Sequence, residues 1–229
     1  MRGFFVTGTD TEVGKSIVAA ALCAALAARG ERVAAFKPVV TGLDDPPGDW
    51  PPDHELLAAA ANAGQSPREV APLRFGPPAS PHLAAELAGE RIEPAELVAA
   101  ARAAAEAADA GVAASRPGVL VAEGVGGLMV PITPGYLVRD LAVDLGLPLL
   151  IAARPGLGTI NHSLLTIEAA RATGLRVEAV VLTPWPDEPS TMELSNRATI
   201  SRLGAVEVRT LAPTTPGSLA QAGATLLAE

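Results

Sequence analysis

The stretch GFFVTGTDTEVGKSIVAAA, residues 3 to 21, decides the fold that this chain is expected to have. Phe4 to Thr7 form an apolar, β-branched and aromatic run that is typical of a buried strand. A short segment between Gly8 and Gly14 follows, and the alanine-rich stretch from Ser16 to Arg29 predicts a helix. A strand, a glycine-bounded loop and a helix N-terminus in this order are the setting of a phosphate-binding loop.

The loop between Gly8 and Ser16 carries the residues that phosphate binding requires. Glycines let the backbone turn its N–H groups inward, and the helix N-terminus adds positive potential. Lys15 would reach the β- and γ-phosphates of a nucleotide, and the Ser16 hydroxyl could ligate Mg²⁺. Gly8 and Gly14 enclose five residues where the usual pattern has four, so the match is to a lengthened variant. The alternative is a βα turn with a chance Gly-Lys-Ser, and the loop alone predicts a nucleotide rather than a reaction.

Strand and helix patterns alternate along the rest of the chain. The expected strands are short and mostly apolar: Phe4 to Thr7, Val33 to Lys37, Val119 to Glu123, Leu149 to Ala153 and Val177 to Thr183. The expected helices are Ser16 to Arg29, Glu55 to Ala63, Pro94 to Ala110, Val138 to Leu145, Ile160 to Thr173 and Thr191 to Leu203. This alternation favours an α/β fold of the P-loop NTPase type, with a mostly parallel central sheet covered by helices on both faces. The length predicts a single domain, residues 1–229.

Glycines and prolines mark where helices should end and where loops should lie. Six glycines stand at or just beyond expected helix ends, where the left-handed capping position favours this residue: Gly30, Gly64, Gly111, Gly146, Gly174 and Gly204. Two proline-rich segments, Asp44 to Asp53 and Pro72 to Pro81, predict long loops. Such loops often carry ligand contacts, and plain connectors are an equally open interpretation.

Charge and composition limit the classes of partner. Hydrophobic residues make up 49% of the chain and charged residues 18%, as in folded rather than disordered proteins. The net charge of -8 argues against a nucleic acid or an anionic membrane as partner, although a local anion site stays possible. The single cysteine, Cys23, allows no intrachain disulfide, and neither a signal-peptide pattern nor an apolar run of membrane-spanning length is found. We therefore expect a cytoplasmic protein.

Three further charged residues are expected at the carboxyl edge of the sheet, where parallel α/β proteins bind ligands. Glu123 ends the strand VLVAE just before a glycine-rich turn and is the first candidate for a Mg²⁺ ligand. Lys37 ends the strand VAAFK and could neutralise charge on a transferring phosphoryl group. For both residues the alternative is a surface charge at a strand end. Asp53 lies where a proline-rich loop meets the next helix, so a helix N-cap explains it as well as a metal ligand does.

Five short motifs follow one another between the start of the chain and about Thr183. They are FFVTGTDTEVGKS from Phe4, FKPVVTG from Phe36, ASPH from Ala79, VAEGVGGLMVP from Val121 and GLGTINHSLLT from Gly156. In this order and spacing they resemble the motifs of dethiobiotin synthetases. The resemblance implies a homodimeric enzyme with a phosphate-loop α/β fold, which closes a cyclic urea from 7,8-diaminopelargonate, CO2 and ATP in biotin synthesis.

The resemblance also implies a mechanism and roles for individual residues. In that family CO2 carbamates one amine, the carbamate oxygen attacks the γ-phosphate, and the second amine displaces phosphate from the mixed anhydride. Lys15 and Lys37 would be catalytic, and Mg²⁺ would be held by Ser16, Asp53 and Glu123. The nucleotide would be bound by Glu12, Val13, Gly14, Lys15, Ser16, Ile17, Asp53, Glu123, Gly124, Val125, Gly126, Thr183 and Pro184. The diamine would be bound by Thr11, Lys37 and Thr41, and its carboxylate by Gly158, Thr159 and Asn161 of the second subunit at a helix N-terminus.

Two positions depart from the family's pattern. Thr41 stands where a serine is common, and either residue offers a hydroxyl. Thr183-Pro184 stands where an asparagine often reads the adenine ring, and threonine cannot make the bidentate contact of an amide. Loose selectivity among nucleotides is therefore expected. Ser80 and His82 belong to a matching loop without an assigned chemical role, and packing is the expected role of His82 and His162.

Other functions can be built on the same scaffold. A cobyrinate-type amide synthetase would normally add a glutaminase domain with a nucleophilic cysteine, for which Cys23 is misplaced. A nucleotide-switch ATPase of the partition or septum-site type, acting through a protein partner, would carry an extra lysine early in the loop. The segment GTDTEVGKS lacks that lysine, and the ending QAGATLLAE is not a basic amphipathic helix.

Overall fold

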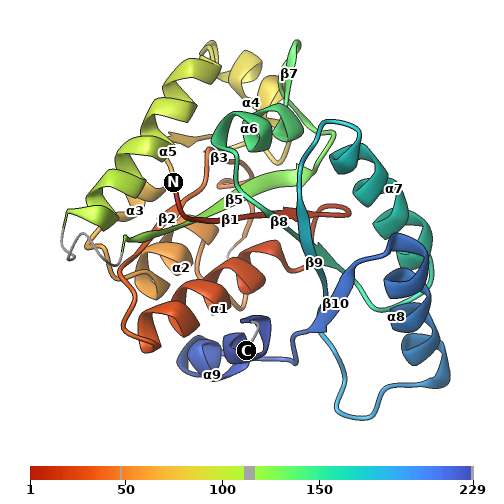
Figure 1. Ribbon diagram of the computed structural model, residues 1–229. Helices are drawn as coiled ribbons and strands as arrows, with labels where there is room; N and C mark the ends of the chain where they lie inside the picture. Colours follow the sequence, from red (N-terminus) through yellow and green to blue (C-terminus); the bar gives the residue numbers. More distant parts are fainter. Residues whose placement is uncertain (47, 111–116, 228–229) are drawn as a thin grey trace.

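A parallel sheet organises the computed structural model, which describes residues 1–46, 48–110 and 117–227 (Figure 1). The six strands lie in the order β10-β9-β8-β1-β5-β2, and each neighbouring pair is parallel. They span Gly3–Gly8 (β1), Val33–Phe36 (β2), Val119–Gly127 (β5), Leu149–Ala153 (β8), Val177–Leu182 (β9) and Glu207–Thr210 (β10). The predicted α/β class with a mostly parallel sheet is confirmed.

Helices and small strands connect and cover this sheet. The longer helices are Lys15–Ala28 (α1), Asp53–Ala60 (α2), Pro81–Ala88 (α4), Pro94–Asp109 (α5), Val138–Leu145 (α6), Thr159–Arg171 (α7) and Thr191–Gly204 (α8). Shorter turns of helix are Pro67–Val70 (α3), Pro216–Ser218 (η1), Leu219–Gly223 (α9) and Ala224–Leu226 (η2). Val39–Val40 (β3) pairs with Leu73–Arg74 (β4), and Pro131–Thr133 (β6) pairs with Tyr136–Leu137 (β7). None of the helices within the described ranges could cross a membrane.

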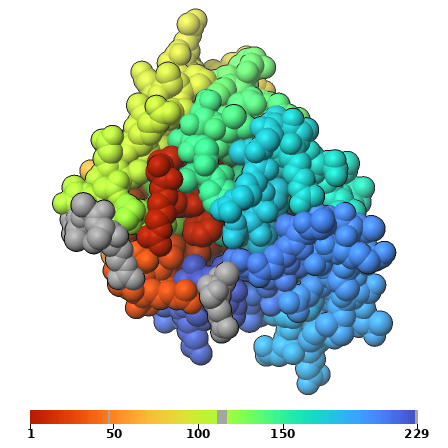
Figure 2. Space-filling model, in the orientation of Figure 1, coloured from red at the N-terminus to blue at the C-terminus, as the bar shows by residue number. Residues whose placement is uncertain are grey.

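Alternation along the strands divides the core between the two faces of the sheet, because successive side chains point to opposite sides. Val6 of β1 packs in a cluster with residues of α1, α2 and α9, whereas Phe5 packs in another with residues of α4, α5 and α6. A third cluster around Ile151 joins β8 and β9 to α7 and α8. Helices therefore lie on both faces, as predicted. Figure 2 shows the start of the chain, in red, reaching the surface in the middle of one side of the molecule.

Local sequence signals explain where several helices begin and end. Ser190 caps α8 through its side chain, which accepts a hydrogen bond from the Glu193 amide, while the Glu193 carboxylate accepts from the Ser190 amide. Proline takes the first position of α5. Gly146 ends α6 in the left-handed conformation, with a φ of 64°. The prediction of left-handed glycines is also confirmed at Gly30, Gly64 and Gly174.

Some of the predicted boundaries are wrong. Strand β5 does not end at Glu123 but runs on to Gly127, because it continues beside the phosphate loop after an irregularity in its pairing with β1. Helix α2 ends at Ala60 rather than Ala63, and Gly64 lies beyond the break. Gly204 is the last residue of α8 and lies against Ile167, whereas Ala205 adopts the left-handed conformation. The predicted cap Gly111 lies outside the described residues.

Candidate active site

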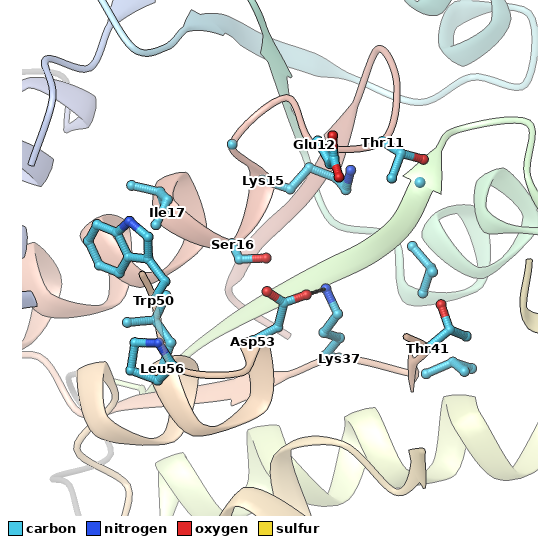
Figure 3. Close-up of a pocket in the computed structure, with 15 residues that line it drawn as sticks. Thr11, Glu12, Lys15, Ser16, Ile17, Lys37, Thr41, Trp50, Asp53 and Leu56 are labelled. Atoms are coloured by element: carbon cyan, nitrogen blue, oxygen red, sulfur yellow. Dashed lines mark ion pairs between the residues drawn. The ribbon is translucent and has the colours of Figure 1, made fainter. Parts of the chain in front are cut away.

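A cavity of about 380 Å³ opens at the carboxyl edge of the sheet, where β1, β2 and β5 end (Figure 3). Most of its lining was predicted from the sequence: Thr11, Glu12, Gly14, Lys15, Ser16, Ile17, Lys37, Thr41, Asp53, Val125 and Gly126. The cavity wall also includes Val39, Trp50, Pro51 and Leu56. Residues separated by more than a hundred positions in sequence thus meet in one site.

The phosphate loop takes the form that its glycines allow. Gly14 precedes α1 with a φ of 86°, a conformation that side-chain-bearing residues rarely adopt. The methyl group of Thr183 lies so close that a Cβ at Gly14 would come within 2.8 Å of it. Lys15 is almost fully buried, and its ammonium group donates a hydrogen bond to the Asp10 carbonyl oxygen at 2.8 Å. The lysine is therefore folded back into the loop that it would use to hold phosphate.

Lys37 is buried between two carboxylates at the end of β2. Its ammonium nitrogen lies 2.5 Å from Oε1 of Glu123 and 2.7 Å from Oδ2 of Asp53. The Ser16 hydroxyl donates to the same Glu123 oxygen at 2.8 Å. Figure 3 shows Lys37 and Asp53 pointing toward each other with Ser16 beside them. Three residues from β5, α1 and α2, together with Lys37 directly after β2, therefore form one contiguous polar cluster.

Burial and charge act on the titrating groups of this cluster in different directions. Burial lowers the pKa of Lys15, and the neighbouring Lys37 adds to that effect. Burial opposes the charged form of Lys37 too, but Glu123 and Asp53 outweigh it and raise the pKa of Lys37. Burial raises the pKa of Glu123, and the Lys37 ammonium limits that rise. Lys37 therefore carries a positive charge throughout the pH range in which proteins are active.

Three side chains in the cluster suit a divalent cation that prefers oxygen ligands. Ser16 offers a hydroxyl, and Asp53 and Glu123 offer carboxylates, which is the donor chemistry of Mg²⁺ sites. The second carboxylate oxygen of Glu123, Oε2, is buried without a hydrogen-bond partner. A buried carboxylate oxygen that lacks a partner is costly, so this atom has unused capacity for a ligand.

Several predicted site residues lie outside the lining of the cavity. Glu123 is fully buried and contacts the cavity residues Ser16 and Lys37 through its Oε1 atom. Val13 is buried in the core, and Gly124 faces Phe5 and Val138 rather than the cavity. Thr183 contacts the loop through Gly14, and its bond to Pro184 is cis. The set Gly158, Thr159 and Asn161 forms the start of α7 and does not reach this cavity within the same chain. The Ser80 hydroxyl and His82 Nδ1 lie 3.0 Å apart beside a separate cavity.

Sequence reasoning missed four residues of the cavity wall, Val39, Trp50, Pro51 and Leu56, as well as Arg154 beside the phosphate loop. Trp50 lines the cavity beside Ile17 and Leu56, and the only signal for it was an aromatic residue in the proline-rich loop shortly before Asp53. Arg154, just beyond the end of β8, donates two hydrogen bonds to the Glu12 carbonyl oxygen. No local pattern announces that contact, because it joins residues far apart in the chain.

Comparisons with known proteins show which family the sequence is similar to. The profile of a family described as an AAA domain matches residues 2–214. A protein of Anaeromyxobacter dehalogenans named ATP-dependent dethiobiotin synthetase BioD is 42% identical over 94% of this chain and 92% of its own length. Proteins of the same name from Bacillus subtilis (34% identical, 93% of this chain, 87% of that protein) and Caulobacter (42%, 82% and 79%) are also similar. The resemblance seen in the motifs is thus confirmed, and the chain belongs to the dethiobiotin synthetase family.

Proposed function

We propose that this protein joins 7,8-diaminopelargonate and CO2 in an ATP-dependent ring closure that yields dethiobiotin. The observation that carries the proposal is that two lysines, a carboxylate and a hydroxyl line one cavity beside a phosphate loop, while the buried carboxylate of Glu123 contacts Lys37 and Ser16. Lys15 and Lys37 are moreover the only lysines of the chain. The names of the family relatives supply the reaction, and the cluster supplies groups suited to it.

The first chemical requirement is to bring two anions together. A carbamate formed from one substrate amine and CO2 carries negative charge, and so does the γ-phosphate that it attacks. The ammonium groups of Lys15 and Lys37 offset this repulsion and stabilise charge on the transferring group. A bond forms between the carbamate oxygen and phosphorus, and the bond to the bridging oxygen of ATP breaks with its electrons leaving on ADP. Lys37 keeps its proton during this step, because Glu123 and Asp53 hold it in the charged form.

The second step closes the ring. The remaining amine attacks the carbonyl carbon of the mixed anhydride, the carbon–oxygen bond to phosphate breaks, and the amine releases a proton. Phosphate thereby leaves with the oxygen atom that the carbamate contributed. Trp50, Ile17 and Leu56 give part of the cavity an apolar wall, which favours the amine over water as the attacking group.

We also propose that Mg²⁺ and a second copy of the chain complete the site. Ser16, Asp53 and Glu123 would hold the ion, which would neutralise charge on the phosphates. Gly158, Thr159 and Asn161 would serve the partner's cavity, with the N-terminus of α7 binding the substrate carboxylate. In support of this, Leu157, next to that segment, is 90% exposed. The whole chain, residues 1–229, would act as one domain within this dimer.

The proposed nucleotide site offers few groups that could recognise the adenine base by hydrogen bonds. Thr183 is buried against the phosphate loop and offers one hydroxyl, so we expect ATP to be used without strict selection against other nucleoside triphosphates.

The experiment that tests the function measures phosphate release from Mg-ATP with bicarbonate, with and without the diamine, and identifies the product by mass. Release that requires the diamine, together with dethiobiotin, is the expected result. In Lys37→Ala, turnover should fall at least about a hundredfold while ATP binding stays within a few fold. ATP hydrolysis at the same rate with and without the diamine would instead favour a nucleotide-switch ATPase. Near-normal turnover of Lys37→Ala would show that Lys37 has no role in the mechanism.

A further inference from the structure

One residue of the lengthened phosphate loop has an unusual backbone conformation. Glu12 has a φ of 56°, and among the described residues only Ala205 is another non-glycine residue with positive φ. For such a residue the left-handed conformation costs about 1–2 kcal/mol, so it persists where surrounding contacts hold it. Glu12 therefore requires a contact that holds it in this conformation.

Arg154 supplies that contact from the neighbouring strand end. It stands directly after β8, and its Nε and Nη2 atoms both donate to the Glu12 carbonyl oxygen, at 3.3 and 3.1 Å. Its guanidinium also lies 3.9 Å from the Glu12 carboxylate, but these side chains are 59% and 86% exposed, and such an exposed pair contributes little. The forked contact with the main chain is thus the significant one.

The geometry of the peptide bond links this contact to ligand binding. In a planar trans peptide the C=O and the following N–H point in opposite directions. Because Arg154 fixes the Glu12 carbonyl on its own side of the loop, the Val13 N–H is turned away from Arg154. Glu12, Gly14 and Lys15 line the cavity and Arg154 does not, so an N–H turned away from Arg154 would face the cavity, where inward N–H groups would bind phosphate.

We propose that Arg154 is a positioning residue for nucleotide binding, which orients the Glu12–Val13 peptide so that its N–H faces the phosphates. The inference rests on the proposed nucleotide site and adds a residue that touches neither ATP nor diamine. It also gives the lengthened loop a physical support, since the arginine that follows β8 holds one of the loop's carbonyl groups.

The chain offers a matched control for this contact. Arg171, on α7, donates through Nη2 to the carbonyl oxygen of Ala205 at 3.1 Å, and Ala205 is the other left-handed non-glycine residue. The Arg171 contact has the same chemistry but lies away from the phosphate loop. Arg171→Ala should therefore reproduce any loss of stability without a loss of nucleotide binding.

The test measures the ATP dissociation constant by calorimetry with Mg²⁺ and without diamine, alongside the melting temperature and steady-state kinetics. Arg154→Ala should weaken ATP binding and raise the KM for ATP about tenfold, the effect of losing one hydrogen bond to a charged group. The kcat at saturating ATP and the KM for the diamine should change less than twofold. Arg154→Lys, which keeps the charge but not the fork, should recover only part of the affinity.

Three results would overturn the inference. They are unchanged ATP affinity in Arg154→Ala, an equal loss of affinity in Arg171→Ala, or a fall in kcat with unchanged affinity, which would place Arg154 in the reaction itself. Because binding is measured without diamine, a failure of the proposed reaction would appear in the activity assay alone.

Discussion

Lys37 and Glu123 are charged residues that the sequence places at strand ends and the fold buries together. Lys37 is 4% exposed and Glu123 is fully buried, so neither is the surface charge that the alternative interpretation assumed. Burying two charges costs several kcal/mol for each ion, and stability alone rarely requires such a pair. A functional role for the pair explains why a buried apolar strand such as β5 carries an acid.

The two lysines give the site a direct spectroscopic reporter, because the chain contains no others. With lysine labelled at the ε-carbon, NMR should show two resonances. Since burial lowers the pKa of Lys15 while two carboxylates raise that of Lys37, the Lys15 signal should titrate first as the pH rises. ATP should shift the Lys15 signal more than the other one. The Lys37→Ala variant should show a single signal, which assigns that signal to Lys15. Two lysines that titrate at the same pH would contradict the described cluster.

Any side chain at position 14 should weaken nucleotide binding. Gly14→Ala places a methyl group on a residue with positive φ and against Thr183, so the loop must shift. We expect ATP affinity at least about tenfold weaker, by calorimetry. Gly30→Ala is the control, because Gly30 has a φ of 80° with open space around it. It should cost about 1 kcal/mol of stability and leave affinity unchanged; equal effects of the two variants on affinity would refute the role of Gly14.

At the scale of elements, the longer periodic segments could be predicted and the long-range details could not. The strand Leu149–Ala153 and the helix Val138–Leu145 have the bounds that their patterns predicted. Strand β10 was missed, because Glu207–Thr210 is four residues long with two charges, and pairing with β9 alone makes it a strand. Similarly, Asp53 is the first residue of α2 while Pro52 takes the N-cap position, and only the fold reveals the ion pair of Asp53 with Lys37.

Helix α1 depends on a close approach of the C-terminal helix α9. Gly223 is buried there, and a Cβ at this position would collide with the carbonyl group of Ala21. Gly223→Ala should therefore destabilise the protein by about 1–3 kcal/mol, as overpacked sites do. Gly217→Ala, with nothing near its Cβ, should leave the free energy of unfolding within about 0.5 kcal/mol of the wild type. Chemical denaturation measures both, and a stable Gly223→Ala would disprove this packing.

At the scale of the whole molecule, the proposed dimer accounts for site residues that do not reach the cavity of their own chain. Leu157 and Leu165 are 90% and 61% exposed at and near the start of α7. A subunit interface would cover such residues, since removing apolar surface from water lowers the free energy. Only the resemblance to the family predicted that the start of α7 meets a second copy, because the residue pattern of α7 itself does not show which side would do so.

Leu157→Asp should separate the subunits and weaken diamine binding. A charge at the interface opposes association, so light scattering should show a lower mass than for the wild type. The KM for the diamine should rise about tenfold or more, while the ATP dissociation constant stays within about twofold. Leu203→Asp, at an exposed position late in α8, is the control and should leave mass and kinetics unchanged. A Leu157→Asp protein with wild-type mass and KM would contradict the proposed interface.

Isotope labelling follows the transfer of the γ-phosphate to a carbamate oxygen. Enzyme, diamine and Mg-ATP are mixed with ¹⁸O-labelled bicarbonate, the reaction is quenched before the label exchanges with water, and the mass of the released phosphate is measured by mass spectrometry. Each phosphate released with dethiobiotin should carry an oxygen atom from bicarbonate, since the anhydride breaks at the carbon–oxygen bond. Phosphate that carries an oxygen atom from water and none from bicarbonate would show direct hydrolysis of ATP, and the site would then not form the mixed anhydride.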